Sequence, residues 1–285
     1  MAGLLRIFAG PGPHPARRPV GEIGAAAGTL APEAAPGIRE SQEEVAVQPD
    51  PSRLMDNLGL ETPAIGLYDA PDAAPFEPCV RPEPGARTCV FAFYKDWLRG
   101  RTLHLTRKAY GCRGAGSCLF GVDERPREEL VTFLVEEEGL KRHRETMTRW
   151  VERRQVHHPE HANVLIGPLR PEQYARLKAV TFFVDPDRLA GLVLAANYDA
   201  GPDDPEPVTA PFGSGCLQLL GPPDAKDASR AIIGGTDAAM RRYLPADMLA
   251  FTVNRPLFQR LCELDERSFL HRPFWKGLQS ARGRA

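Results

Sequence analysis

No stretch of this 285-residue chain approaches the ~20 consecutive apolar residues that a membrane-spanning helix needs. The chain also lacks an excess of charge, because 36 Lys and Arg balance 37 Asp and Glu and leave a formal net charge of -1. A nearly neutral chain has no overall field that attracts nucleic acid or an anionic membrane. These two absences predict a protein with no membrane span and no nucleic-acid partner.

Aromatic residues are nearly missing from residues 1–50, where Phe8 stands alone among abundant Ala, Gly and Pro. Such a composition supplies too little apolar surface for a core, so we expect a disordered N-terminal leader. Arg6 interrupts its one apolar run, which is too short for a secretory signal. No apolar segment follows Arg17 and Arg18, as a twin-arginine export signal requires. These features predict a cytoplasmic protein.

From residue 52 onward, short apolar runs alternate with segments of helical periodicity. Strands are predicted at 64–68, 102–106, 163–166, 180–184, 207–211, 231–233 and 248–253, and helices at 52–60, 89–99, 128–138, 141–155, 187–198, 237–243 and 256–264, with two more starting at Cys112 and Gly215. Alternating strands and helices favour an α/β sheet covered on both faces. Several connections are too short for crossovers, so we expect a mixed sheet in a single compact domain over residues 52–280.

The six cysteines lack the compact C-x2-C spacing of zinc and ferredoxin motifs. Cys89, Cys112 and Cys216 nevertheless each lie at or near a predicted helix start. Backbone N–H groups and the helix dipole stabilise a thiolate there, and a thiolate is a better nucleophile and metal ligand than a thiol. Cys118 follows Cys112 at C-x5-C spacing and is the candidate fourth member of the group.

Three interpretations of these cysteines stay open. In the first, Cys89, Cys112, Cys118 and Cys216 ligate a metal or an iron–sulfur cluster, since dispersed thiolates are known cluster ligands. In the second, Cys112 is a nucleophilic or redox thiol that Cys118 or Cys216 resolves. In the third, the cysteines are small buried apolar residues with no shared chemistry. The remaining two cysteines fit only the third interpretation: Cys79 and Cys262.

Several short motifs follow one another along the chain in a recognisable order. They are Ala64-Ile65-Gly66-Leu67, then Cys89, Cys112-Arg113-Gly114-Ala115, Leu119-Phe120-Gly121, Gly167-Pro168-Leu169, Phe182-Phe183-Val184-Asp185-Pro186 and Gly213-Ser214-Gly215-Cys216. Over roughly residues 52–270 this order resembles the bacterial and archaeal family known as domain of unknown function 169. The resemblance implies one compact α/β domain and adds weight to Cys89, Cys112 and Cys216, but it implies no settled activity. Cys118 matches less clearly, and the leader lies outside it.

Two glycine-rich turns each lie between a predicted strand and a predicted helix. They are Gly213-Ser214-Gly215 and Gly234-Gly235, and backbone N–H groups at such turns can bind an anion. Neither turn forms a Walker loop or a complete dinucleotide fingerprint. They support the alternative hypothesis, a non-enzymatic module that binds a small anionic ligand or a protein partner and whose cysteines are structural.

A dense histidine segment, His157-His158-Pro159-Glu160-His161, precedes the strand predicted at 163–166. Its proline interrupts the i, i+4 geometry of helical zinc sites, and the sequence identifies no acidic partner opposite the imidazoles. We therefore expect a surface loop here. The basic helix predicted just before it is interpreted as a solvated face, because the sequence shows no recognisable helix-turn-helix motif.

The leading hypothesis is a protein that binds a thiolate-ligated cofactor, with an iron–sulfur cluster as the first candidate. Its role would be redox chemistry or cofactor handling, which implies a redox partner or another protein partner. No general base can be identified in the sequence, so we assign neither a catalytic reaction nor a substrate.

Overall fold

A computed structural model of the chain describes residues 49–122, 125–153, 159–210 and 230–283. The strands are β1 (Ile65–Ala70), β2 (Cys79–Val80), β3 (Thr102–Leu105), β4 (Asn163–Pro168), β5 (Leu177–Val184), β6 (Val208–Thr209), β7 (Ala231–Gly234) and β8 (Leu249–Asn254). The α-helices are α1 (Ser52–Leu58), α2 (Tyr94–Leu98), α3 (Arg113–Phe120), α4 (Arg127–Thr132), α5 (Arg144–Arg153), α6 (Pro186–Asn197), α8 (Ala238–Arg241), α9 (Arg255–Cys262) and α10 (Pro273–Ala281). Short helical segments are η1 (Ala74–Phe76), η2 (Val90–Phe93), η3 (Phe133–Glu137), η4 (Pro171–Arg176) and η5 (Phe269–His271). The predicted leader lies outside the described residues up to residue 48.

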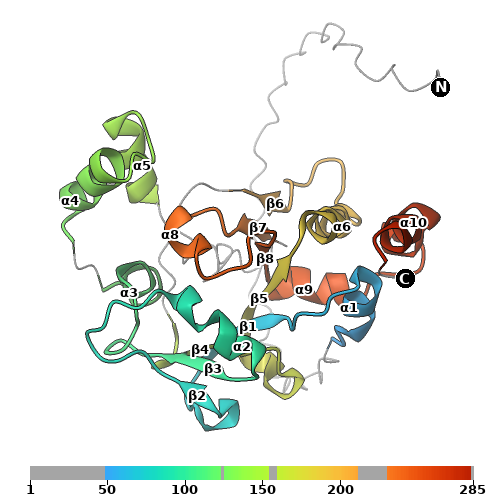
Figure 1. The fold of residues 1–285 in the computed structure, drawn as a ribbon, viewed down its shortest axis with the longest axis horizontal. Helices are drawn as coiled ribbons and strands as arrows, with labels where there is room; N and C mark the ends of the chain where they lie inside the picture. Colours follow the sequence, from blue (N-terminus) through green and yellow to red (C-terminus); the bar gives the residue numbers. More distant parts are fainter. Residues whose placement is uncertain (1–48, 123–124, 154–158, 211–229, 284–285) are drawn as a thin grey trace, which may run out of the picture. The chain divides into compact units, whose positions relative to one another are not determined.

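The strands form one eight-stranded sheet in the order β2-β3-β4-β1-β5-β8-β7-β6 (Figure 1). The pairs at its two edges, β2 with β3 and β6 with β7, are parallel. The pairs between them are antiparallel. The mixed α/β sheet predicted from the short connections is therefore confirmed.

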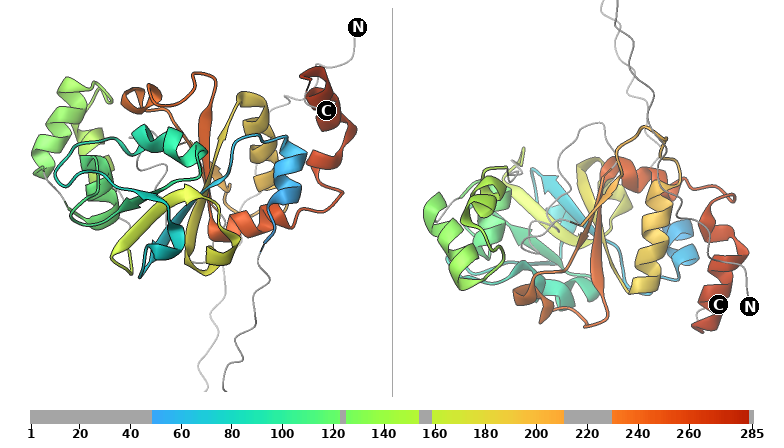
Figure 2. Two further views of the ribbon diagram at one scale, coloured as in Figure 1. Left: turned by 60° about the horizontal axis from the view of Figure 1, so that its bottom comes forward. Right: turned by 90° about the horizontal axis from the view of Figure 1, so that it is seen from above.

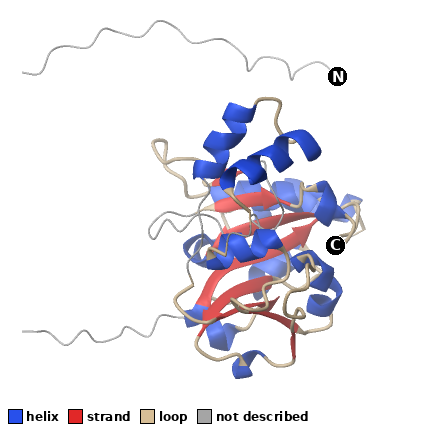
Figure 3. Ribbon diagram, turned by 90° about the vertical axis from the view of Figure 1, so that its left-hand side faces the viewer, coloured by secondary structure: helices blue, strands red, loops and turns tan. Residues whose placement is uncertain are grey.

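Helices cover both faces of the sheet (Figure 3). On one face α1, α6, α9 and α10 enclose the first core, which includes Leu54, Tyr68, Leu165, Phe182, Val184, Phe251, Phe258 and Trp275. On the other face η2, α2, α3 and α8 enclose the second core, which includes Leu67, Phe91, Trp97, Leu103, Leu119, Val164, Phe183 and Met240. Phe182 and Phe183 thus point to opposite cores. A strand buried on both faces reads as a nearly continuous apolar run, and in β5 only Lys178 and Thr181 interrupt that run.

Two strand-to-helix turns use the same local chemistry. The side chain of Asp185 accepts a hydrogen bond from the backbone N–H of Arg188 (2.9 Å) and caps α6, whose first residue is Pro186. The side chain of Asn254 likewise accepts from the N–H of Leu257 (3.2 Å) and caps α9. A capping side chain satisfies an N–H group that has no partner within the helix. The cap and first-turn proline predicted for α6 are confirmed.

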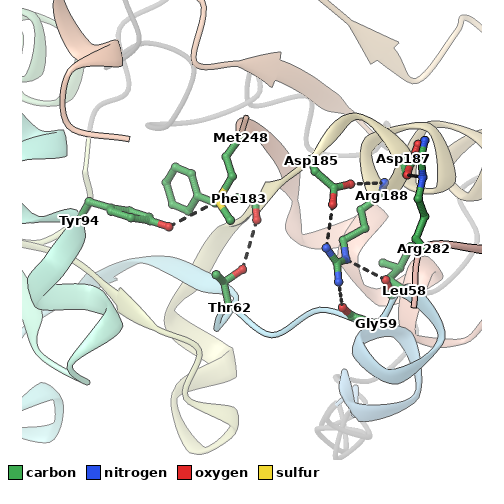
Figure 4. Close-up of polar contacts among 10 residues, drawn as sticks. All are labelled: Leu58, Gly59, Thr62, Tyr94, Phe183, Asp185, Asp187, Arg188, Met248 and Arg282. Atoms are coloured by element: carbon green, nitrogen blue, oxygen red, sulfur yellow. Dashed lines mark hydrogen bonds and ion pairs between the residues drawn. The ribbon is translucent and has the colours of Figure 1, made fainter. Parts of the chain in front are cut away.

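Arg188 connects the start of α6 to the end of α1 (Figure 4). Its guanidinium pairs with Asp185 (2.8 Å) and donates to the carbonyl oxygens of Leu58 (3.2 Å) and Gly59. Both members of the ion pair are largely buried, with side chains 14% and 15% exposed. The guanidinium therefore satisfies carbonyl groups at the C-terminus of α1 that the helix itself leaves without partners.

Helix α10 completes the first core, and the sequence did not predict it. Figure 2 shows α10 (dark red) beside α6 (gold) and α1 (blue). The indole of Trp275 lies against Gly191 of α6 and donates to the carbonyl oxygen of Asn57 (2.7 Å). Arg282, at the end of α10, pairs with Asp187 (2.9 Å). These contacts attach the helix to the domain.

Other departures from the sequence-based expectations are local. Cys79 lies in the two-residue edge strand β2 rather than in a turn, because its backbone pairs with β3.

The helix predicted at 128–138 changes from α4 to the π-helical η3. Together with α5 it surrounds a small separate cluster of Val131, Met147 and Val151. Within the described part of the chain, no helix has both the length and the apolar character to cross a bilayer.

The contact between α6 and α10 predicts opposite effects for two Gly→Ala substitutions. An added Cβ at Gly191 would lie 2.5 Å from the Trp275 ring, whereas at Gly277 of α10 nothing lies within 4 Å. We expect Gly191→Ala to lower the free energy of unfolding by about 1–3 kcal/mol through overpacking. Gly277→Ala should raise it by about 0.5–1 kcal/mol, since Ala favours a helix interior. Urea denaturation measures both, and equal effects would contradict the packing described.

Candidate functional site

Two of the predicted site cysteines are found at helix starts. Cys89 is the N-cap residue of η2, and Cys112 is the N-cap residue of α3. The Cys112 Sγ accepts a hydrogen bond from the backbone N–H of Ala115 (3.4 Å). An N–H group directed at sulfur stabilises the negative charge of a thiolate. The sequence-based placement of these two residues at helix starts is therefore confirmed.

Gly111 allows the two cysteine-bearing segments to lie side by side. Gly111 has a φ of 78°, and a Cβ added to it would lie 2.7 Å from the carbonyl oxygen of Thr88. The segment ending in Cys112 therefore packs directly on the backbone that precedes Cys89. This approach requires a residue without a side chain that also tolerates positive φ, and glycine meets both requirements.

The ring of Tyr110 packs against the same segment. A Cβ on Gly116, in the first half of α3, would lie 2.6 Å from that ring, so the ring lies close against the helix backbone. Tyr110, Cys89 and Cys112 all pack against the second core. The N-terminal half of α3 and the residues before it therefore contact both a neighbouring loop and an aromatic ring.

Cys118 lies deeper in the same core. It is 3% exposed, within α3, and belongs to the second core that Cys89 and Cys112 also contact. The three described members of the predicted ligand set therefore share one core. They form no group of three ligand atoms within 4.8 Å among the described residues, so a single ion is not already enclosed by these three sulfurs.

Other predicted positions lie outside the described residues. These are Cys216 with its turn Gly213-Ser214-Gly215, and also His157 and His158. Whether Cys216 joins the other cysteines stays a prediction.

The second glycine-rich turn is described, and packing explains its glycine. Gly235 has a φ of 80°, and an added Cβ would lie 3.2 Å from the backbone nitrogen of Ala250 on β8. The helix that follows, α8, has only four residues, and the Asp237 side chain accepts the N–H of Ala239 (2.7 Å). The N–H group of Ala239 therefore already has a carboxylate partner. Anion binding at Gly234 and Gly235 stays a prediction.

Cys79 and Cys262 pack against the first core, whereas the three described cysteines of the predicted ligand set contact the second core. Burial, followed by the charges of Asp50 and Glu263, raises the pKa of Cys262 to about 12. Burial and then the charge of Glu77 raise the pKa of Cys79. A raised pKa keeps a thiol protonated at neutral pH, so both are poor nucleophiles and poor ligands there.

The histidine segment has an acidic partner that the sequence did not identify. Asp69, 2% exposed on β1, accepts the backbone N–H groups of Glu160 (2.6 Å) and His161 (3.0 Å). The Nδ1 atom of His161 lies 3.2 Å from the same carboxylate. Asp69 and His161 are 92 positions apart in the sequence, and no local pattern connects them. The expectation that no acidic group lies opposite the histidine segment is therefore wrong, because Asp69 contacts it.

The close contact at Gly111 predicts a specific sensitivity. Gly111→Ala adds a clash with the Thr88 carbonyl to the strain of positive φ, whereas Gly100→Ala, at a φ of 79° with nothing within 4 Å, adds only the strain. We expect Gly111→Ala to destabilise the fold by about 1–3 kcal/mol more than Gly100→Ala. Thermal unfolding of both variants measures this, and equal losses would argue against the contact between the two segments.

The cysteine environments predict an order of reactivity. In the reduced, chelator-treated chain, we expect iodoacetamide to modify Cys112 well before Cys79 and Cys262. Burial raises the pKa of each of the latter two thiols, whereas the Ala115 N–H group is directed at the Cys112 sulfur and stabilises its thiolate. The modification rates of Cys79 and Cys262 should increase as the pH rises from about 7 to about 10, as more of each thiol ionises. Peptide mass spectrometry at timed intervals gives the rates. Equal modification of Cys112 and Cys262 at neutral pH would contradict this order.

Comparison with known proteins supports the resemblance seen in the sequence. The model of domain of unknown function 169, described as uncharacterised ArCR, matches residues 53–263. The match covers the cysteines of the predicted ligand set and the histidine segment. No curated protein and no solved structure matches the chain. Because the match spans most of the sequence, this chain belongs to the family of domain of unknown function 169.

Proposed function

We propose that this protein binds an iron–sulfur cluster through cysteine thiolates and acts in redox chemistry or cofactor handling. Cys89 and Cys112 are the proposed central ligands, and Cys118 and Cys216 are the remaining candidates. The observation that supports the proposal is the contact between Gly111 and the Thr88 carbonyl, which packs two N-cap cysteine segments against each other.

The surroundings of the two sulfurs suit a thiolate-ligated cofactor. The N–H of Ala115 donates to Cys112, and N–H donors to sulfur are among the features that tune cluster potentials. Cys89 and Cys112 are half-buried against an apolar core, so each sulfur has one side in a low-dielectric environment. A half-buried position also leaves a short path for electrons to a partner protein.

The position of Cys118 favours a cluster over a single ion. Cys118 lies within α3 and Cys112 is the N-cap residue of that helix, and with Cys89 their sulfurs, all three described by the structure, form no group of three ligand atoms within 4.8 Å of one another. One zinc ion with bonds of about 2.3 Å to sulfur does not bind all three without movement of the chain. A multi-iron cluster distributes its ligands over a wider volume and accepts dispersed cysteines more readily.

Anaerobic purification followed by iron, sulfide and visible-absorption measurements tests the proposal. We expect iron and acid-labile sulfide in stoichiometric amounts and a visible absorption band. Cys89→Ser and Cys112→Ser should each lose most of the iron, because serine replaces a thiolate ligand. Cys79→Ser and Cys262→Ser are matched controls, since they also remove a half-buried thiol but lie elsewhere.

Two outcomes would overturn the proposal. One is a colourless, iron-free protein after anaerobic purification and reconstitution with iron and sulfide. The other is full iron content in both Cys89→Ser and Cys112→Ser, with circular dichroism showing that the variants are folded.

A further inference from the structure

We propose a second site in this protein, independent of the cysteines, that binds a divalent transition-metal ion through Asp69, Glu160 and His161. Among the described residues these three form the one group whose His, Cys, Asp or Glu ligand atoms all lie within 4.8 Å of one another. They join a buried strand to the segment before β4. Imidazole together with carboxylate is a donor set that Mn²⁺, Fe²⁺ and Zn²⁺ accept.

Asp69 is the fixed component of this site. Its carboxylate is nearly fully buried at the end of β1, and the N–H groups of residues 160 and 161 hold its two oxygens. Oδ2 has a second lone pair beyond the one that the Glu160 N–H occupies, and Oδ1, which accepts the His161 N–H, also faces Nδ1 of His161. Hydrogen bonds of this kind orient a carboxylate ligand before the ion arrives.

His161 is already at the distance of a neighbouring ligand. Its Nδ1 lies 3.2 Å from Asp69 Oδ1. Two donors bound to one ion at about 2.1 Å, with an angle between 90° and tetrahedral, are separated by about 3.0–3.4 Å.

Glu160 supplies the exposed side of the site. Its side chain is 71% exposed, and its Oε1 lies 3.2 Å from the ammonium of Lys178. A positive group therefore already stands beside this carboxylate. Since Lys178 offers one charge against two carboxylates, a divalent ion is the better match for the charge of the group.

The segment that carries Glu160 and His161 is fixed to the sheet next to them. The Asn163 side chain donates to the carbonyl oxygens of Ala70 (3.1 Å) and Pro71 (2.8 Å), and its Oδ1 contacts His104 Nε2 at 2.8 Å. Arg81 holds the other ring nitrogen of His104 (2.8 Å). A fixed segment reduces the ordering that ligands must undergo on binding a metal.

Mn²⁺ is the probe that separates this site from the cysteine site, because thiolates favour softer ions. We expect one Mn²⁺ per chain in the full-length, chelator-treated protein, measured as loss of the free Mn²⁺ signal in electron paramagnetic resonance. His161→Ala and Glu160→Gln should each weaken binding by about tenfold or more. Both variants keep the backbone N–H groups that hold Asp69, so the fold should remain, as circular dichroism would verify.

Three further variants complete the test. His143→Ala removes an exposed histidine on the approach to α5 and should leave the affinity unchanged. Lys178→Ala removes the competing ammonium and should tighten binding about two- to fivefold. Cys112→Ser should retain the Mn²⁺ affinity whether or not the cysteine proposal holds.

The inference fails if no saturable binding occurs below about 1 mM Mn²⁺. It also fails if folded His161→Ala and Glu160→Gln bind Mn²⁺ as tightly as the unaltered chain. Binding that Cys112→Ser abolishes would assign the ion to the cysteines and overturn the second site.

Discussion

Burial of the sheet on both faces is the constraint on which the rest of this structure depends. Successive side chains of an inner strand enter two different cores, so any polar group on such a strand needs a partner inside the protein. Thr181 and Thr252, paired across β5 and β8, share a hydrogen bond of 2.8 Å. His104 lies between Arg81 and Asn163, and burial lowers its pKa. Because the Arg81 guanidinium donates to Nδ1, this imidazole is held neutral with its proton on Nε2.

Asp69 satisfies the same constraint in a different way. Its partners are backbone groups of a loop, together with an imidazole, rather than a side chain on the neighbouring strand. A buried carboxylate with donors along one side keeps lone pairs directed toward the loop. The proposed metal site therefore uses a carboxylate that these hydrogen bonds already hold in place.

Helix caps and helix starts could be predicted from the sequence, whereas contacts between segments far apart in the sequence could not. The cap at Asp185 and the helix start at Cys112 depend on residues within four positions of each other, and both were predicted. The contact between Gly111 and Thr88 depends on two loops meeting, which no periodicity encodes. The strand order could not be predicted for the same reason, because an alternation of helices and strands along the chain is compatible with parallel or antiparallel neighbours. Helix α10 was missed because it is short, and only Trp275 and Leu278 of its side chains pack against the first core, so the apolar repeat spans a single turn.

The pairing register places both candidate sites on one face of the sheet. Asp69 pairs with Val164 across β1 and β4, and directly paired residues point to the same face. Val164 belongs to the second core, which Cys89 and Cys112 also contact, whereas the neighbouring pair Ala70 and Asn163 points to the other face. A shift of one residue in this register would turn Asp69 toward the first core and away from that face. The register of β1 against β4 therefore decides whether the carboxylate shares a face with the thiols.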